Sequence, residues 1–532
     1  MAVHARMEAR TSGYADTMTV NLGPLESYWI ASAAAADHAA LDADLEVDVA
    51  VVGGGIAGLC TAWELTRAGR SVAVLEAGRV AAGVTGHTTA KLSVQHGLCY
   101  AQLRRRFGAE AARRYALSQS AAVEHAFATA EALSIDCQLE RSDSYVYTET
   151  REGVPAIREE VDAARAAGLE ASFVTETGLP YPVAGAVRIA GQAQFHPRRY
   201  LLGLVEGILA GGGRIFERTR VVGMERDGDP VVLAVEGGPE VRAKDAVVTT
   251  HYPVFDRLRL FSRLSPYREV VVAGAIAAEA DPGGMYITSE GGTRSVRTAP
   301  YTGGKRLLIV TGESFTPGSE DVRDRFERLA GWTAERFGIT DLACHWAAQD
   351  NTTTDGVPFV GRFPGGDPHV YVATGFGGWG MSNGIMAGRL ITALANGEAP
   401  AWAGLYDPSR LHPAKEARGF VSFQKEVAAH FVGDRITGSG TARTPADLRP
   451  GEGAVMKIDG ERRAVYRGLD GGVRALSATC THLGCLVGFN NAERTWDCPC
   501  HGSRFDVDGG VLGGPATRPL HRYETGSEDS GS

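Results

Sequence analysis

Two short boxes of cysteine and histidine near the C-terminal end constrain this chain more than any other feature. The first box, residues 480–485, is Cys-Thr-His-Leu-Gly-Cys, and the second, residues 498–503, is Cys-Pro-Cys-His-Gly-Ser. Together they supply two thiolates, two imidazoles and two further thiols. That is a complete ligand set for a mixed cysteine and histidine metal centre. A fold built on these residues has to bring both boxes to one point.

The ligand types alone leave two kinds of centre open. A tetrahedral zinc site could use the same residues, since zinc accepts two cysteines and two histidines. The remaining pair, Cys485 and Cys500, could bridge the two boxes as a disulfide, for which a zinc site has no use. The extra pair therefore favours an iron–sulfur centre over zinc.

The boxes resemble those of Rieske [2Fe–2S] proteins, and the resemblance covers roughly residues 445–524. It implies that Cys480 and Cys498 bind one iron and that His482 and His501 bind the other. Neutral imidazoles leave the cluster less negative than four thiolates would, so a Rieske cluster accepts an electron more readily than a plant-type ferredoxin. The resemblance therefore implies an electron-transfer domain.

Two further positions bear on the reduction potential. Ser503 matches the family position that donates a hydrogen bond to a cluster sulfur, which raises the potential. Phe505 stands where high-potential members carry a tyrosine hydroxyl. We therefore expect a potential below the top of the Rieske range.

A dinucleotide-binding pattern begins near residue 46. Residues 47–52 predict a buried strand, residues 53–58 a glycine-rich turn and residues 59–68 a helix, and a second strand, 71–75, ends in Glu76. The cofactor-binding residues predicted in the turn are Gly53, Gly55, Ile56, Ala57 and Gly58. Gly53 allows a tight turn, Gly55 lets the pyrophosphate approach the backbone, and Gly58 allows close packing of helix on strand. The helix N-terminus would hold the phosphates, and Glu76 would accept hydrogen bonds from the ribose hydroxyls.

The small polar loop 83–91 follows the second strand and could pass close under a flavin. Its candidate contacts are Thr85, His87, Thr88 and Lys91. We therefore expect the glycine-rich turn to bind the phosphates of the cofactor and this loop to contact its flavin ring.

From here the N-terminal 400 residues resemble the FAD-dependent family of D-amino-acid oxidase, glycine oxidase and sarcosine oxidase. The resemblance is carried by residues 194–197, 246–250, 354–361 and 370–381. It implies an α/β FAD-binding Rossmann-type domain with an antiparallel-sheet (α+β) substrate domain, to which the small all-β Rieske domain is appended.

A second G-x-G-x-x-G, formed by Gly375, Gly377 and Gly380, lies between a predicted strand and a helix over 383–395. It could mark a separate NAD(P)H site, or its backbone could pack against FAD and form one wall of the FAD site. No acid ends a following strand, which a second dinucleotide site would need. The pattern therefore favours the wall, where the helix dipole could stabilise an anionic reduced flavin.

The expected organisation follows from these motifs. We expect a flexible N-terminal extension (1–45), the oxidoreductase (46–400), a helical extension (401–437), a linker (438–446), the Rieske domain (447–524) and a tail (525–532). The FAD-binding parts would be about 46–95, 190–250 and 345–400, and the substrate parts about 96–189 and 251–344.

Charge and hydropathy bound the partners. The net charge is −9, with no basic cluster interleaved with aromatics, so we expect no nucleic-acid partner. No run reaches the roughly 18–20 apolar residues of a membrane helix, and the start lacks a signal-peptide core. Four cysteines are scattered singly, as in reduced proteins: Cys60, Cys99, Cys137 and Cys344. We expect a cytoplasmic protein without membrane insertion.

Enzymes of the resembled family remove a hydride from a carbon that bears nitrogen, so the expected substrate is a small amine or amino acid. The catalytic candidates are His87, His345 and Gln349. His87 lies where some dimethylglycine-dehydrogenase-like members attach the flavin covalently, although an ordinary polar contact near the ring is the favoured interpretation. Arg297, Tyr286 and Tyr301 could bind a carboxylate or stack on the substrate.

Together the two halves predict a dehydrogenase that passes electrons singly from FAD through the [2Fe–2S] cluster to an external acceptor. A Rieske oxygenase would need a mononuclear iron site with a close histidine pair, which the sequence outside the boxes lacks. Two alternatives stay open: an NAD(P)H-dependent electron-transfer reductase, and a non-enzymatic flavin and iron–sulfur redox sensor.

Overall fold

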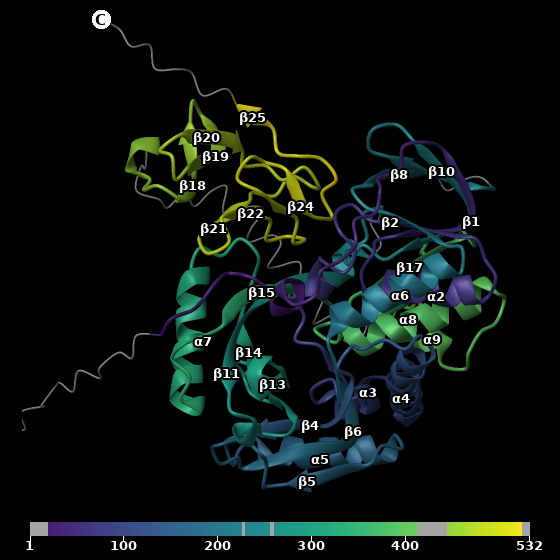
Figure 1. Cartoon of the computed structure of the whole chain (residues 1–532), viewed down its shortest axis with the longest axis vertical. Coiled ribbons are helices and arrows are strands. Elements are labelled where there is room, and N and C mark those ends of the chain that lie inside the picture. Colours follow the sequence, from purple (N-terminus) through teal and green to yellow (C-terminus); the bar gives the residue numbers. More distant parts are fainter. Residues whose placement is uncertain (1–19, 226–228, 256–259, 366, 412–443, 524–532) are drawn as a thin grey trace, which may run out of the picture.

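The computed structural model describes residues 20–225, 229–255, 260–365, 367–411 and 444–523. Two large sheets form the body of the molecule, and two small sheets form the C-terminal part (Figure 1). Among the helices of these described ranges, none is long and apolar enough to cross a membrane.

The first sheet has the Rossmann-type arrangement that the glycine-rich turn predicts. Its order is β16-β17-β10-β1-β2-β7, in which β17, β10, β1, β2 and β7 run parallel. The strands are β1 (Leu45–Val52), β2 (Val72–Leu75), β7 (Arg214–Phe216), β10 (Glu240–Val248), β16 (Phe359–Arg362) and β17 (Val370–Thr374). The antiparallel strands β8 (Val221–Glu225) and β9 (Val231–Val235) extend it from β10.

Three helices cover one face of this sheet: α2 (Ile56–Arg67), α6 (Pro197–Ala210) and α8 (Gly380–Ala395). Their apolar sides join Val49 and Val51 of β1 in the largest core of the molecule. α2 packs between α6 and α8 and also contacts β1, while α8 contacts β17. This packing fixes both glycine-rich turns.

The second sheet is the larger one, with the order β15-β11-β14-β13-β12-β4-β6-β3 and β5 paired to β6. All pairs are antiparallel except β12 with β4. Its strands are β3 (Lys91–Leu92), β4 (Glu140–Thr148), β5 (Ala171–Val174), β6 (Gly185–Gln194), β11 (Leu264–Ile276), β12 (Met285–Thr288), β13 (Ser295–Pro300), β14 (Arg306–Phe315) and β15 (Cys344–Thr353). This confirms the expected antiparallel substrate sheet.

Helices flank this sheet on two sides. α7 (Val322–Phe337) packs on β11 and β14, while α3 (Cys99–Phe107), α4 (Ala109–Ala132) and α5 (Val154–Ala166) lie near β4 and β6 (Figure 1). The loop between β2 and β3 contains the short helix η1 (Val84–His87), which packs against β15.

The expectation of a flexible extension over residues 1–45 is wrong for residues 20–45. Helix α1 (Tyr28–Ala31) packs on η1, and Trp29 is fully buried with its Nε1 donating to the Thr88 carbonyl at 2.6 Å. Backbone bridges join Asn21 to Asp341 and Leu25 to His345. The buried indole and the backbone bridges thus anchor this segment to the loop that contains η1 and to β15. Residues 1–19 lie outside the described residues.

The C-terminal part is all-β, as expected. One sheet has the order β18-β19-β20-β25 and the other β21-β22-β23-β24, and every pair is antiparallel. The strands are β18 (Gly453–Ile458), β19 (Glu461–Arg467), β20 (Val473–Ser477), β21 (Gly488–Asn490), β22 (Thr495–Asp497), β23 (Arg504–Phe505), β24 (Val511–Gly513) and β25 (Arg522–Tyr523).

The connection to this domain is described only at its ends. Helix α9 (Ala403–Tyr406) follows α8, and the turn η6 (Pro445–Asp447) precedes β18. The predicted helical extension and linker fall largely on residues 412–443, which lie outside the described residues.

Candidate FAD and iron–sulfur sites

The two cysteine and histidine boxes meet at one end of the C-terminal domain. The first box leads from β20 to β21 and the second from β22 to β23. Each closes on itself, because the Cys480 amide donates to the Cys485 carbonyl and the Cys498 amide to the Ser503 carbonyl, both at 2.8 Å. A disulfide joins Cys485 to Cys500 and so ties the boxes together.

The four predicted cluster ligands come together in this arrangement. The rings of His482 and His501 lie 4.9 Å apart between centroids and nearly perpendicular, at 89°. The thiols of Cys480 and Cys498 are hydrogen-bonded to each other, which lowers the pKa of Cys480 to about 7 and raises that of Cys498. Cys498 also lies close to Cys485 and Cys500, but those two sulfurs are joined to each other.

Unpartnered nitrogens test whether these residues fit a cluster. The Nδ1 atoms of His482 and His501 are buried and have no hydrogen-bond partner in the part of the chain that the structure describes. Burial lowers the pKa of His482 to about 4 and that of His501 to about 3, so both imidazoles are neutral near pH 7. Neutral imidazoles with free Nδ1 atoms and a pair of adjacent thiols fit the Rieske ligand set.

The surroundings of the sulfurs match the expectations for Ser503 and Phe505. Ser503 is fully buried, its hydroxyl is hydrogen-bonded to the Cys480 thiol, and its Oγ accepts from the Ala516 amide at 3.0 Å. Phe505 is fully buried in the same core cluster as Cys480 and Cys498. The phenyl ring thus lies in the cluster environment without offering a hydrogen bond.

The first glycine-rich turn is shaped by positions where no side chain fits. Gly53 has φ +106°, and a Cβ there would lie 2.7 Å from the Thr249 carbonyl oxygen. A Cβ on Gly58 would lie 1.9 Å from the Gly53 oxygen. Gly55 forms the N-cap of α2 without a capping side chain, which leaves the start of the helix open toward a phosphate.

Polar groups complete this cradle. The Glu76 carboxylate accepts from the amides of Gly54 and Gly78, both at 2.7 Å, so it is fixed at the end of β2. Burial raises its pKa, although these two hydrogen bonds oppose the shift. Thr85 Oγ1 accepts from the Ile56 amide at 3.1 Å and so holds the loop 83–91 against the start of α2. Ala57 is buried in the first turn of that helix.

The second glycine-rich turn belongs to the same cofactor edge. It follows β17, which is parallel to β10 and two strands from β1, so both turns lie at the carboxyl ends of parallel strands of one sheet. Gly375 and Gly377 have φ +75° and +60°. One sheet edge with two turns favours a single dinucleotide bounded by the second turn, which begins α8 at Gly380.

The loop 83–91 lies between the cofactor edge and the second sheet. Thr88 accepts from Trp29, and the His87 carbonyl accepts from Trp346 Nε1 at 2.8 Å. The His87 ring lies 2.9 Å from the Gly83 oxygen through Nδ1, and burial lowers its pKa. Lys91 Nζ donates to the Tyr286 carbonyl at 2.7 Å and to the Ser295 hydroxyl, and burial lowers the pKa of Lys91 to about 7.

The two catalytic candidates on β15, His345 and Gln349, contact different parts of the molecule. His345 lies 3.1 Å through Nδ1 from the Leu22 oxygen and packs edge-on against Phe326 of α7, which offers no support for catalysis. Gln349 Nε2 instead donates to the Gly502 carbonyl at 3.0 Å. Gln349 therefore contacts the second cysteine and histidine box.

The substrate-binding candidates also have structural partners. Arg297 is buried and its Nη1 donates to the Ala90 carbonyl at 2.6 Å, while the Tyr286 hydroxyl donates to the Pro282 carbonyl at 2.8 Å. Tyr301 packs against Tyr28, with ring centroids 5.9 Å apart. The structure does not bring these three residues to the glycine-rich turns by any contact of the described chain.

The cluster histidines face the oxidoreductase. The ring of His501 lies edge-on to Tyr252 and Phe261, at 5.7 and 5.5 Å between centroids, and Tyr252 also lies 6.3 Å from His482. Tyr252 and Phe261 belong to the segment that leads from strand β10 of the first sheet into β11. The C-terminal domain accordingly sits against β15 and the start of α7 (Figure 1).

A buried ion cluster fastens this interface. Arg268 of β11 lies 2.5 Å from Glu493 and 3.0 Å from Asp497, and Arg504 contacts the same two acids at 3.1 and 3.3 Å. Burial by itself would raise the pKa of Glu493, but the two guanidinium groups outweigh it and lower the pKa to about 2. The network therefore keeps the Glu493 carboxylate ionised at the contact between the two domains.

The sequence did not single out three residues of β11, Tyr267, Arg268 and Glu269, whose side chains lie on the two faces of the second sheet. Tyr267 and Glu269 point to one face and Arg268 to the other, as strand alternation requires. His251, at φ +64°, lies 3.3 Å through Nε2 from Asp350. Alternation was visible in the sequence, but which face meets which partner depends on contacts far apart along the chain.

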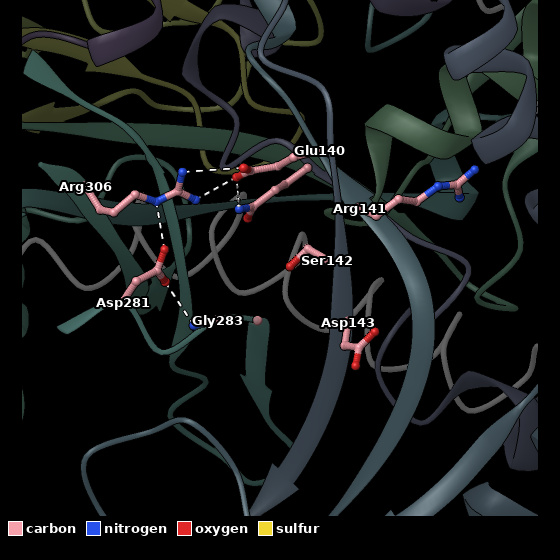
Figure 2. A pocket seen from close by; sticks show the side chains of 9 residues that line it. Glu140, Arg141, Ser142, Asp143, Asp281, Gly283 and Arg306 are labelled. Carbon is pink, nitrogen blue, oxygen red and sulfur yellow. Dashed lines mark hydrogen bonds and ion pairs between the residues drawn. The ribbon is translucent and has the colours of Figure 1, made fainter. Parts of the chain in front are cut away.

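A cavity of about 420 Å³ lies elsewhere on the second sheet. Figure 2 shows Arg306 pointing to Glu140 and Asp281, with which it forms ion pairs at 2.6 and 2.7 Å. Of the predicted catalytic, FAD-binding and cluster residues, none lines it. Each charged group of its lining already has an ion-pair partner, since Arg141 pairs with Glu124 and Asp143 with Arg188. We therefore do not assign the chemistry to this cavity.

The fold and the two sites define a flavin-dependent oxidoreductase joined to a Rieske-type iron–sulfur domain. The chain belongs to the FAD dependent oxidoreductase family, whose model matches residues 48–394, and residues 441–524 match the Rieske [2Fe-2S] domain. The first match implies FAD and the second a [2Fe–2S] cluster.

A relative and three solved structures agree with this assignment. The Bacillus subtilis protein named as a putative Rieske 2Fe-2S iron-sulfur protein, YhfW, is 33% identical over 94% of this chain and 97% of its own length. Glycine oxidase from Geobacillus kaustophilus superposes with a TM-score of 0.58 at 21% identity, covering 69% of this chain and 100% of that one. L-proline dehydrogenase from P. horikoshii shares the fold with a TM-score of 0.56 at 18% identity, covering 69% of this chain and 98% of that one. L-amino acid deaminase from Proteus vulgaris shares it with a TM-score of 0.57 at 15% identity, covering 70% of this chain and 99% of that one.

The C-terminal domain has separate relatives. The cytochrome b6-f complex iron-sulfur subunit of Chlorobaculum tepidum is 37% identical over 84 residues, which is 16% of this chain and 46% of that protein. The likeness is confined to the domain that carries the boxes.

Proposed function

We propose that this protein is a dehydrogenase that oxidises a C–N bond of a small amine or amino acid and passes the electrons to an external acceptor. FAD supplies a two-electron oxidation and a [2Fe–2S] cluster carries electrons one at a time. In this proposal Gly53, Gly55, Ile56, Ala57, Gly58, Glu76, Thr85, His87, Thr88, Lys91, Gly375, Gly377 and Gly380 surround FAD, and Cys480, His482, Cys498 and His501 hold the cluster. The division of labour follows the expected domains, with the oxidoreductase over about 46–400 and the cluster domain over about 447–524.

The observation that carries the proposal is the orientation of the cluster histidines. His501 is 4% exposed and packs on Tyr252 and Phe261 of the oxidoreductase, while His482 is only half-buried. One imidazole thus faces the side on which the flavin would lie, and the other retains access to solvent. This arrangement supports entry of electrons on one side of the cluster and exit on the other.

Two structural facts bear on the alternatives. Both glycine-rich turns lie at one edge of one sheet, which argues against a separate NAD(P)H-binding domain in the described chain. The side chains that line the second sheet next to the turn include a carboxylate, Glu269, that a pure redox sensor would not require. A sensor differs in its behaviour, because no metabolite would reduce its flavin.

The test compares the protein with a Cys498→Ser variant that lacks a cluster ligand. With a substrate found by an anaerobic screen of amines and amino acids, the variant should still bleach its flavin but should lose reduction of a one-electron acceptor such as cytochrome c. Rapid oxygen consumption that is unaffected by loss of the cluster would overturn the proposal. Failure of every amine and amino acid to bleach the flavin would favour the sensor.

A further inference from the structure

One face of β11 and β15 lies against the second glycine-rich turn. Tyr267 and Asp350 are cross-strand partners, and Glu269 follows two residues later on the same face. Asp350 Oδ2 accepts from the Gly378 amide at 2.6 Å, and a Cβ on Gly378 would lie 2.9 Å from the Tyr267 hydroxyl oxygen. These contacts place the face directly against the turn proposed to wall the flavin.

The opposite flank of Glu269 is the loop 83–91. Val271, the next residue on this face, packs in a core with Trp29 and Ala90. Lys91 interacts electrostatically with Glu269. Glu269 therefore lies between the two segments that the proposed function places around FAD, where a substrate would have to bind.

The Glu269 carboxylate has no hydrogen-bond partner among the described residues, whereas the cationic side chains near it are already hydrogen-bonded. Within the described ranges the carboxylate of Glu269 and the hydroxyl of Tyr267 have no hydrogen-bond partner, and both side chains are only partly buried. Lys91 is held by the Tyr286 carbonyl and Ser295, and Arg297 by the Ala90 carbonyl. Arg268 points to the opposite face and is bound by Glu493 and Asp497. The available charge at this place is negative.

We propose that Glu269 binds the ammonium group of the substrate, which makes the substrate a cationic amine without a carboxylate on the reacting carbon. This inference rests on the proposed function and narrows its substrate class. The proton leaves the ammonium nitrogen, where the N–H bond breaks, and forms an O–H bond on Glu269. The neutral amine that remains is the form from which a hydride can depart.

Two further features of the site agree with this role. Burial raises the pKa of Glu269 to about 7, against the opposing effect of Lys91, and a base with that pKa exchanges protons readily near neutral pH. Asp350 adds a second carboxylate on the same face, paired with His251 at 3.3 Å. A substrate carboxylate placed here would meet two acids and no uncommitted arginine of the described chain.

The test uses the holoenzyme and matched pairs of probes: ethylamine with alanine, dimethylamine with sarcosine, and pyrrolidine with proline. Binding is measured without oxygen from the change in the visible flavin spectrum, and flavin bleaching is followed separately. We expect at least one amine to bind about tenfold or more tightly than its carboxylated partner, and Glu269→Gln to weaken that binding about tenfold or more. Glu279→Gln, an exposed glutamate on the same chain segment, should change nothing.

Tighter binding of the carboxylated partner in every pair, no binding by any amine, or unchanged affinity in Glu269→Gln would overturn the inference. The comparison within each pair needs only the unaltered protein, so it decides even if the variant fails to fold. An amino acid that bleaches the flavin and then reduces the cluster would refute the role of Glu269 while leaving the proposed function intact.

Discussion

Gln349 and Asp350 are consecutive residues of β15 whose side chains reach opposite sides of the second sheet. Gln349 Nε2 donates to the carbonyl of Gly502, the residue after the cluster ligand His501, at 3.0 Å. Asp350 Oδ2 accepts from the amide of Gly378 in the second glycine-rich turn at 2.6 Å. Two adjacent side chains thus connect the proposed flavin wall with the cluster box through one strand.

Removal of the Gln349 amide should slow electron transfer without affecting substrate oxidation. One neutral hydrogen bond contributes about 1 kcal/mol, so Gln349→Ala should reduce the population of the fully docked box, and the rate of cluster reduction, about fivefold. Stopped-flow absorbance after anaerobic mixing measures both steps. Gln102→Ala on α3, away from the interface, serves as the control. An equal slowing of flavin bleaching would show that Gln349 acts on the substrate instead.

The ion cluster around Arg268 should hold the two domains together. Arg268→Met leaves Glu493 and Asp497 without their main partner, and removing one member of a buried pair costs about 3–5 kcal/mol. We expect the cluster domain of this variant to unfold separately from the flavin domain, as followed by cluster absorbance and flavin fluorescence. Arg113→Met breaks an exposed pair with Glu110 and should cost less than about 1 kcal/mol. Coincident unfolding in Arg268→Met would contradict the role.

The same interface should weaken in acid. The pKa of Glu493 is lowered to about 2, so its ionised form stabilises the docked state above the ordinary glutamate range, near 4.5. That contribution is lost as the pH falls from about 4.5 toward 2.

Binding of a cationic amine should grow with pH through the neutral range. The pKa of Glu269 is raised to about 7, so the carboxyl is uncharged below that value and charged above it. Lys91, also with a pKa of about 7, loses its positive charge over the same range and reinforces the trend, while Asp350 and Arg294 are the other charged groups that act on Glu269. Spectral titrations should show about tenfold weaker binding per pH unit below 7. A flat profile in the unaltered protein would contradict the role of Glu269.

The cluster potential should respond to a hydroxyl at position 505. Phe505 is fully buried in the core that contains the cluster cysteines, so Phe505→Tyr places a hydroxyl donor in that core. A hydrogen bond of about 1 kcal/mol in favour of the reduced cluster corresponds to about 40 mV. Redox titration followed by electron paramagnetic resonance measures the shift. An unchanged potential would mean that the ring points away from the cluster.

Local patterns in the sequence were sufficient for the ligand boxes and the first cofactor turn. The spacing of Cys480, His482, Cys498 and His501 and the run from Gly53 to Gly58 are short-range signals, and the structure gathers each set at one point. The role of Trp29 and the docking of His501 on Tyr252 depend on contacts between segments far apart along the chain. The orientation of Glu269 depends on which side of a strand faces a partner. Helical and strand periodicity carry no information about those contacts.

The central claim is that electrons pass within one chain from the flavin site to the Rieske cluster. The most direct measurement mixes the oxidised protein with a reducing amine or amino acid in the absence of oxygen and records flavin absorbance and the electron paramagnetic resonance of the reduced cluster in the same samples over time. The account predicts that the flavin bleaches first and that the cluster signal then rises at a rate independent of protein concentration. Flavin bleaching without a cluster signal, or a cluster rate proportional to protein concentration, would contradict it.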